Sequence, residues 1–218
     1  MKVGDVVLVD YTARVKETGR VFDTTYEEVA KKEGIFNPRF KYKPIPIILG
    51  SKTILPGVEE KILEMNVGEK KKFVLPPEKA FGKRYETLVK LVPLSEFKKQ
   101  DIEPYPGMIV TMNNIKGRVI SVSGGRVKID FNHPLAGKEI EYELEIKKKI
   151  VKKVEKVKAI VEYLLGVEDV NIDVNNCEVI ITFEKNIDVP SSLKERMASM
   201  IKRWISGIKK VKFVYVFE

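Results

Sequence analysis

Hydrophobic and polar residues alternate at the start of the chain. Over residues 3–15, Val7, Val9 and Tyr11 fall on one side of an extended segment. A period of two residues is typical of a strand with one buried face, so we expect a strand here. Residues 16–20 contain the turn sequence Lys-Glu-Thr-Gly-Arg, which predicts a hairpin.

Further short elements follow the hairpin. Residues 21–23 are extended and carry one acid, Asp23, which we expect to be buried. Thr25 is expected to cap a helix that runs to residue 32, because Glu28 follows three residues later. The pattern also predicts a buried strand end at 47–50, a helix over 58–65, a strand over 70–75 and a long strand over 139–146.

The middle of the chain has a strand pattern of its own. Turn sequences at 106–107, 113–114 and 124–125 separate short runs of alternating residues. The strands expected here are 88–92, 108–110, 118–122 and 126–130. Residues 86–132 therefore read as a compact, β-rich insertion.

The last third of the chain predicts a third unit. The expected order is a helix over 152–165, strands over 169–174 and 177–184, a helix over 191–206 and a strand over 211–217. This αββαβ module has fewer than 70 residues, a size that is marginal for an isolated core. We therefore expect 151–218 to form a homodimer, with the exposed strand at 212–217 pairing across a twofold axis.

Composition narrows the class of protein. With 218 residues, 44% of them hydrophobic, the chain can form two or three small domains. No apolar run approaches the roughly 18 residues that span a bilayer, so no membrane association is expected. A single cysteine, Cys177, excludes an internal disulfide and argues against most zinc sites, and a single histidine, His133, argues against a histidine-ligated metal or a Ser-His triad. We expect no metal, no cofactor and a reducing cytoplasmic location.

The net charge of +9 does not by itself indicate a nucleic-acid partner. The excess is +5 over residues 1–85, +2 over 86–150 and +2 over 151–218, so it is spread along the chain. A solvated surface explains such a distribution better than a nucleic-acid footprint. Association with RNA through 147–153 stays open as a weaker alternative.

Four separated motifs occur in a telling order: Val21-Phe22-Asp23, the run from Ile54 to Glu60 (Ile-Leu-Pro-Gly-Val-Glu-Glu), Ala80-Phe81-Gly82, and Asn-His-Pro-Leu-Ala-Gly-Lys over 132–138. In these motifs the chain resembles the FKBP-type peptidyl-prolyl cis-trans isomerases, in particular the long SlyD-like and archaeal branch. The resemblance covers about 1–150. It implies an α+β fold: an FKBP-like antiparallel sheet wrapped on a short helix, with an insert-in-flap chaperone domain. The implied domains are 1–85 plus 133–150 for the isomerase and 86–132 for the insert, with 151–218 left as the C-terminal α+β domain.

The resemblance also implies the site residues. Those expected in catalysis are Tyr11, Phe22, Asp23, Leu55, Phe81 and Tyr142, and those expected in substrate binding are Ile54, Val58, Leu135 and His133. The Leu55 backbone N–H would bind a substrate carbonyl. Val58 stands where many members have tryptophan, and Phe81 where most have a tyrosine that donates to substrate. Taken alone, His133 is more typical of a residue that hydrogen-bonds within a loop.

The function implied is prolyl isomerisation fused to chaperone activity, with unfolded or nascent polypeptides as partners. An apolar site suits this reaction because no bond is broken and no proton is transferred. The alternative is a non-catalytic holdase, a chaperone that binds unfolded chains while Val58 and Phe81 leave the pocket degraded. Each aromatic could also be ordinary sheet core, and only their combination with Asp23 and Gly57 favours a pocket.

Overall fold

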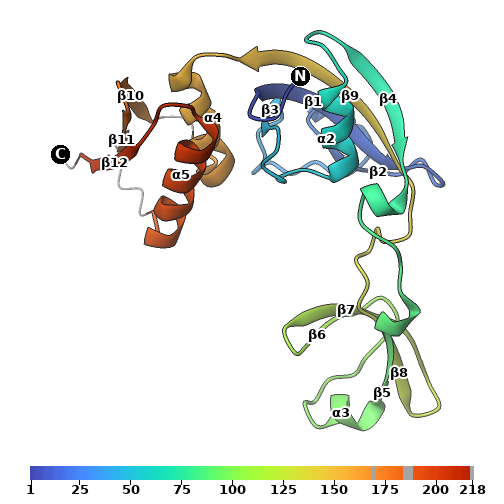
Figure 1. The fold of residues 1–218 in the computed structure, drawn as a ribbon. Coiled ribbons are helices and arrows are strands. Elements are labelled where there is room, and N and C mark those ends of the chain that lie inside the picture. Colours follow the sequence, from blue (N-terminus) through green and yellow to red (C-terminus); the bar gives the residue numbers. More distant parts are fainter. Residues whose placement is uncertain (168–169, 184–188, 217–218) are drawn as a thin grey trace. The chain divides into compact units, whose positions relative to one another are not determined.

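The computed structural model describes residues 1–167, 170–183 and 189–216 (Figure 1). The chain forms two compact units. One contains Met1–Leu75 and Glu141–Glu218, and the other contains Pro76–Ile140. The second unit is thus inserted into the first, as the sequence pattern predicts.

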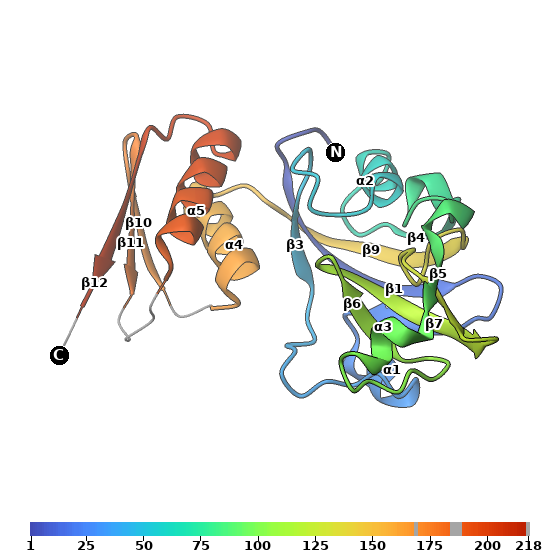
Figure 2. The ribbon, with the colours of Figure 1, turned by 90° about the horizontal axis from the view of Figure 1, so that it is seen from below.

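The first unit is built on a five-stranded sheet. Its strands are β1 (Val6–Val15), β2 (Val21–Thr24), β3 (Ile45–Ile48), β4 (Lys70–Leu75) and β9 (Ile140–Ile150). The order is β2-β1-β9-β4, and β3 pairs with the first half of β1. Helix α2 (Pro56–Leu63) lies against one face of this sheet (Figures 1 and 2). Val58 and Ile62 on α2 are buried, so this helix supplies part of the core.

Both helices of this region differ from the expectation at their starts. Helix α2 begins at Pro56 and not at residue 58, because proline suits the first helical turn, where no amide donor is needed. Helix α1 (Glu27–Lys32) begins after Tyr26, and Thr25 does not cap it. Instead, the Thr25 hydroxyl donates to the buried Asp10 carboxylate at 2.8 Å. A buried acid without a partner is costly, and this competing role explains the error.

The inserted unit contains a four-stranded antiparallel sheet. Its elements are β5 (Val89–Pro93), α3 (Leu94–Lys98), β6 (Ile109–Met112), β7 (Ile115–Ser123) and β8 (Arg126–Asp130), and two single 3₁₀ turns precede them, η1 (Pro77–Lys79) and η2 (Glu86–Leu88). The strand order is β5-β8-β7-β6. Phe97 from α3 closes a small core over Val119, Val127 and Ile129. The strands were expected within a few residues of their bounds; α3 was not, since five residues give no periodicity to detect.

The C-terminal elements follow the expected αββαβ order. They are α4 (Lys153–Leu165), β10 (Asn171–Asn175), β11 (Glu178–Phe183), α5 (Ser191–Trp204) and β12 (Lys210–Tyr215). The sheet order is β10-β11-β12, and β11 runs parallel to β12. Both helices cover one face of this sheet (Figures 1 and 2). The residues at 168–169, 184 and 217, which we expected in strands or their connection, lie outside the described residues.

The C-terminal elements share their core with the first sheet. Val6, Ile48 and Ile150 belong to the same buried cluster as Val157 and Ile160 of α4. An ion pair between Lys43 and Glu162 joins the same two regions. The α+β fold class is therefore confirmed, whereas the division into three domains stays a prediction.

Candidate active site

Tyr11 and Asp23 face each other across the first two strands. The β1–β2 register pairs Ala13 with Asp23, and the Tyr11 hydroxyl donates to the Asp23 Oδ2 at 2.7 Å. We expected Asp23 to be buried, and that expectation is wrong, because its side chain is exposed. Val21 and Thr24 of the same four-residue strand are buried, so the exposure is specific to the Asp23 position.

Two aromatic rings extend the site from Tyr11. The Tyr142 ring, which is 8% exposed, lies 5.8 Å from the Tyr11 ring and 5.9 Å from the Phe73 ring, measured between centroids. The planes of Tyr142 and Phe73 differ by only 10°, so these two rings stack. Phe22, on β2 beside Asp23, is half-buried. Tyr11, Phe22 and Tyr142 were expected in the site, but Phe73 was not.

The two tyrosines are held in their neutral form. Burial raises the pKa of Tyr11, and the negative charge of Asp23 raises it further. Burial also raises the pKa of Tyr142, again with a contribution from Asp23. A neutral Tyr11 hydroxyl is a donor, which is the state that the Asp23 carboxylate requires. The site thus contains one anion whose polar partner does not titrate near neutral pH.

The turn before α2 exposes one backbone donor. Leu55 is the residue that precedes the helix, and its carbonyl accepts from the Val58 and Glu59 amides at 3.0 and 3.1 Å. Within the described residues, the Leu55 amide N–H itself donates to no acceptor. Ile54 and Leu55 are half-buried, and Val58 is 3% exposed. The expected donor is therefore available in a largely apolar setting.

Phe81 and His133 lie together in the inserted unit. Their rings stack with centroids 4.7 Å apart and planes 2° apart. The His133 Nδ1 accepts from the Leu135 amide at 3.1 Å, which is a hydrogen bond within a loop. Leu135 is half-buried, and His133 is exposed. The ring stacking is new information, because sequence spacing cannot reveal contacts between residues 52 positions apart.

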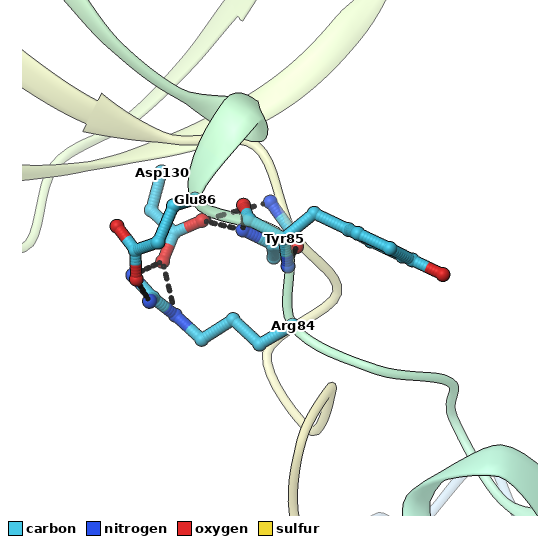
Figure 3. Close-up of polar contacts among 5 residues, drawn as sticks. Arg84, Tyr85, Glu86 and Asp130 are labelled. Carbon is cyan, nitrogen blue, oxygen red and sulfur yellow. Dashed lines mark hydrogen bonds and ion pairs between the residues drawn. The ribbon is translucent and has the colours of Figure 1, made fainter.

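The two arms that lead into and out of the insert pair with each other, and we call residues 82–88 and 131–137 the neck. Arg84 Nη2 donates to Asp130 Oδ2 at 2.9 Å, and Arg84 also forms an ion pair with Glu86 (Figure 3). The Tyr85 amide donates to Asn132 Oδ1 at 2.9 Å, and the Asn132 amide nitrogen donates to the Tyr85 carbonyl at 2.9 Å. Burial alone would raise the pKa of Asp130, but hydrogen bonds from Asn132 and Arg84 outweigh it and lower the pKa.

Neither a metal site nor a membrane span is found in the described part of the chain. No group of three or more His, Cys, Asp or Glu side chains there could hold a metal ion. No helix among the described residues is long and apolar enough to cross a bilayer.

Known proteins resemble the chain over the regions just described. Residues 1–104 match the family model for "FKBP-type peptidyl-prolyl cis-trans isomerase", and residues 90–135 match the model for "FKBP26, IF domain". The short-type peptidyl-prolyl cis-trans isomerase of Methanocaldococcus jannaschii is 41% identical over 147 residues, 67% of this chain and 92% of that protein. The FKBP-type 16 kDa isomerase of Escherichia coli is 29% identical over 64% of this chain and 87% of its own length. The SlyD isomerase of Helicobacter pylori is 27% identical over 66% of this chain and 72% of its own length.

A sheet that packs on a short helix and is interrupted by a second sheet defines a class, the prolyl isomerases with an inserted domain. At 41% identity over nearly all of a known isomerase, the chain belongs to the FKBP-type peptidyl-prolyl cis-trans isomerase family. It is an FKBP-type isomerase with an IF, or insert-in-flap, chaperone domain, and its substrates are polypeptides.

Proposed function

We propose that the Tyr11–Tyr142–Phe73 cluster and the turn at Ile54 and Leu55 form the hollow in which an Xaa-Pro bond rotates. Phe22 and Val58 complete the apolar lining, and Phe73 is added here to the residues predicted from sequence. The observations that support this proposal are the unused Leu55 N–H and the contact of the Tyr142 ring with the rings of Tyr11 and Phe73. By family resemblance, Phe81, His133 and Leu135 are also assigned to substrate binding.

The proposed chemistry depends on loss of solvent. Rotation about a peptide bond has a barrier of roughly 18–20 kcal/mol because twisting destroys the amide resonance. A planar amide is more polar than a twisted one, so a dry hollow destabilises the planar ground state more than the transition state. A ten-thousandfold acceleration requires only about 5.5 kcal/mol of such differential stabilisation. No nucleophile, metal or cofactor takes part in this scheme.

Asp23 and Leu55 have separate roles in the proposal. The Leu55 N–H donates to a substrate carbonyl and fixes the peptide while the prolyl bond turns. Asp23 accepts from Tyr11 and holds the aromatic wall, so it is a positioning residue and not a proton-transfer base. The apolar Val58 and Phe81 stand where many relatives have tryptophan and tyrosine. If a tyrosine there donates to substrate, its loss costs roughly 0.5–1.5 kcal/mol, which lowers the rate without abolishing it.

The decisive experiment is cis/trans exchange of an Xaa-Pro tetrapeptide, measured by NMR with and without the protein at micromolar concentration. We expect acceleration that falls with Tyr142→Ala and with Phe73→Ala, because both rings line the hollow. Ser121→Ala on β7 is the matched control and should leave the rate unchanged. An absence of acceleration would remove the proposed catalytic site, and indifference to both ring substitutions would remove the site assignment.

The insert is proposed to hold unfolded segments near the site. Large apolar side chains of this unit are exposed, among them Leu91, Tyr105, Ile109 and Ile115. Tethering a binding surface to the catalytic unit raises the local concentration of proline-containing segments, to about millimolar for a short connection. Replacing residues 86–132 by a short turn should abolish suppression of client aggregation while tetrapeptide isomerisation persists. A pure holdase would instead show aggregation suppression with no isomerisation.

We also propose that the protein forms a homodimer through its C-terminal elements. Strand β12 is an edge of the described three-stranded sheet, and its free edge could pair with a second copy. Light scattering of the full chain should give twice the monomer mass, and Val211→Pro on β12 should give the monomer. A monomeric full chain would refute the dimer.

A cytoplasmic location is proposed from the single cysteine, Cys177, and cell fractionation tests it.

A further inference from the structure

The inserted unit contains a cavity of about 390 Å³, and the proposed reaction assigns a role to one of its lining residues, His133. It lies between strand β7 and the return arm of the neck. The residues on which the argument rests are Arg84, Ile109, Lys116, Arg118, Ile120 and Lys138. All of its lining residues belong to this one unit.

The charge of this cavity is strongly positive. Arg84 is neutralised by Asp130 and Glu86 (Figure 3). Among the described residues, Lys116, Arg118 and Lys138 form no ion pair with any acid. Together with Arg84 they make four positive charges against the two carboxylates of Asp130 and Glu86, so a net charge of +2 remains around the cavity.

Of the five acids of the insert, two lie at this cavity, Asp130 as a lining residue and Glu86 bound to Arg84. Within residues 115–130 there are four basic side chains and one acid, Asp130, which Arg84 already binds. Three of the other acids of the insert lie within residues 96–103, on or just after α3. Strands β7 and β8 therefore carry more basic than acidic side chains, although the insert as a whole is nearly balanced.

Apolar side chains lie between the positive charges. Ile109 is 54% exposed and Ile120 is 41% exposed, and both line the cavity together with Pro134. Exposed β-branched side chains beside unpaired cations form a surface that suits an apolar group flanked by carboxylates.

We propose that this cavity binds acidic polypeptide segments, in which Asp or Glu flanks an apolar residue. The inference rests on the proposed chaperone function of the insert and deepens it by naming the preferred client. Charge complementarity selects the acidic residues, and Ile109 and Ile120 receive the apolar one. Single-stranded RNA is also anionic, but its sites usually present aromatic rings for base stacking, and the one aromatic ring among the lining residues, His133, already stacks on Phe81.

The cavity adjoins the residues assigned to substrate binding. His133 lines it, and the same ring stacks on Phe81. A segment held there lies beside the return arm, so acidic clients would be retained next to residues of the proposed substrate site. The expected result is faster folding of clients whose prolines lie near acidic residues.

The test compares three labelled unfolded peptides by fluorescence anisotropy with the full-length protein. They share the same leucine and proline positions, and their flanking residues are all Glu, all Gln or all Lys. We expect the Glu peptide to bind about fivefold more tightly than the Gln peptide, as two rim ion pairs of ordinary strength would give. The preference should disappear near 1 M salt, where the Debye length falls to about 3 Å.

Two double variants locate the effect. Lys116→Gln with Arg118→Gln should abolish the preference, whereas Lys98→Gln with Lys99→Gln on α3 removes the same charge and should preserve it. Equal affinity for the Glu and Lys peptides in the unmodified protein would overturn the proposal, and this measurement needs no variant. Loss of preference in both double variants would also overturn it, as would an RNA oligonucleotide that displaces the Glu peptide at lower concentration. Failure of every peptide to bind would instead refute the chaperone function itself.

Discussion

The hydrogen bond from Tyr11 to Asp23 gives the sharpest test of the aromatic wall. Tyr11→Phe removes the hydroxyl that donates at 2.7 Å and keeps the ring that lies 5.8 Å from Tyr142. The variant therefore separates the anchoring of the wall from the wall itself. Without this hydrogen bond, the ring and the Asp23 carboxylate must be ordered when substrate binds. The free-energy cost of ordering them then raises the barrier to isomerisation.

The magnitude follows from the exposure of the acceptor. A hydrogen bond to a charged group contributes about 1.5–3 kcal/mol, but Asp23 is exposed, so water competes for its oxygens. We therefore expect a loss of about 1 kcal/mol, equivalent to roughly a fivefold fall in kcat/KM. Tyr11→Leu should lose more, because it also removes an aromatic contact that contributes about 0.5–1.5 kcal/mol.

A double-mutant cycle completes the measurement. Asp23→Ala alone and in combination with Tyr11→Phe should give nearly the same loss, because both remove one bond. The assay is exchange NMR on a prolyl tetrapeptide, with urea unfolding to confirm that each variant is folded. Fully additive losses would refute the positioning role. A fall of more than about a hundredfold for Tyr11→Phe would refute it too, since the hydroxyl would then contact the reacting amide.

Three further predictions concern stability. Gly117→Ala should destabilise the insert by about 1–3 kcal/mol in thermal unfolding, since a Cβ there would lie 2.7 Å from the Ile129 side chain; an unchanged melting temperature would contradict the packing. Asp5→Asn should cost about 1–2 kcal/mol in urea unfolding, because the buried Asp5 carboxylate accepts from the Lys149 ammonium at 2.7 Å; a neutral result would show that this pair contributes nothing. The pKa of Asp130 is lowered in the folded protein, so its contribution is complete above its unfolded pKa, about 3.9, and is lost as the pH falls below that value. The protection factors of the neck amides, which correct for the intrinsic pH dependence of amide exchange, should therefore fall below about pH 4, and constant protection down to pH 2 would contradict the assignment.

Local patterns were enough to predict most elements of this fold. The alternation of residues 3–15 and 139–146 indicated β1 and β9, and the αββαβ order of the C-terminal elements followed from periodicity and turns. Such signals are carried by residues that are close in sequence. The pairing of β1 with β9 could not be predicted from such signals. The paired residues are about 130 positions apart in the sequence, and several strand orders would bury the same faces.

The candidate site was likewise predicted only where local motifs mark its residues. The motifs around Asp23, Leu55 and Phe81 were recognisable because each is a short run of sequence. The stacking of Phe73 on Tyr142 was not, although Phe73 lies on the half-buried side of the expected strand at 70–75. Exposure of Asp23 also escaped prediction, because it depends on which side chains of β2 the rest of the fold covers.

The hydrogen bonds of the neck bear on which inserts this protein can carry. The Gly137 amide donates to the Gly82 carbonyl at 2.8 Å, and the Phe131 amide donates to the Leu88 carbonyl at 3.0 Å. Backbone hydrogen bonds thus hold the two ends of the insert together before its own sheet begins. Since closing a loop costs little more as the loop lengthens, a neck of this kind can carry modules of very different size. An insert with a different client preference can then replace this one, while the sequence of the catalytic sheet stays the same.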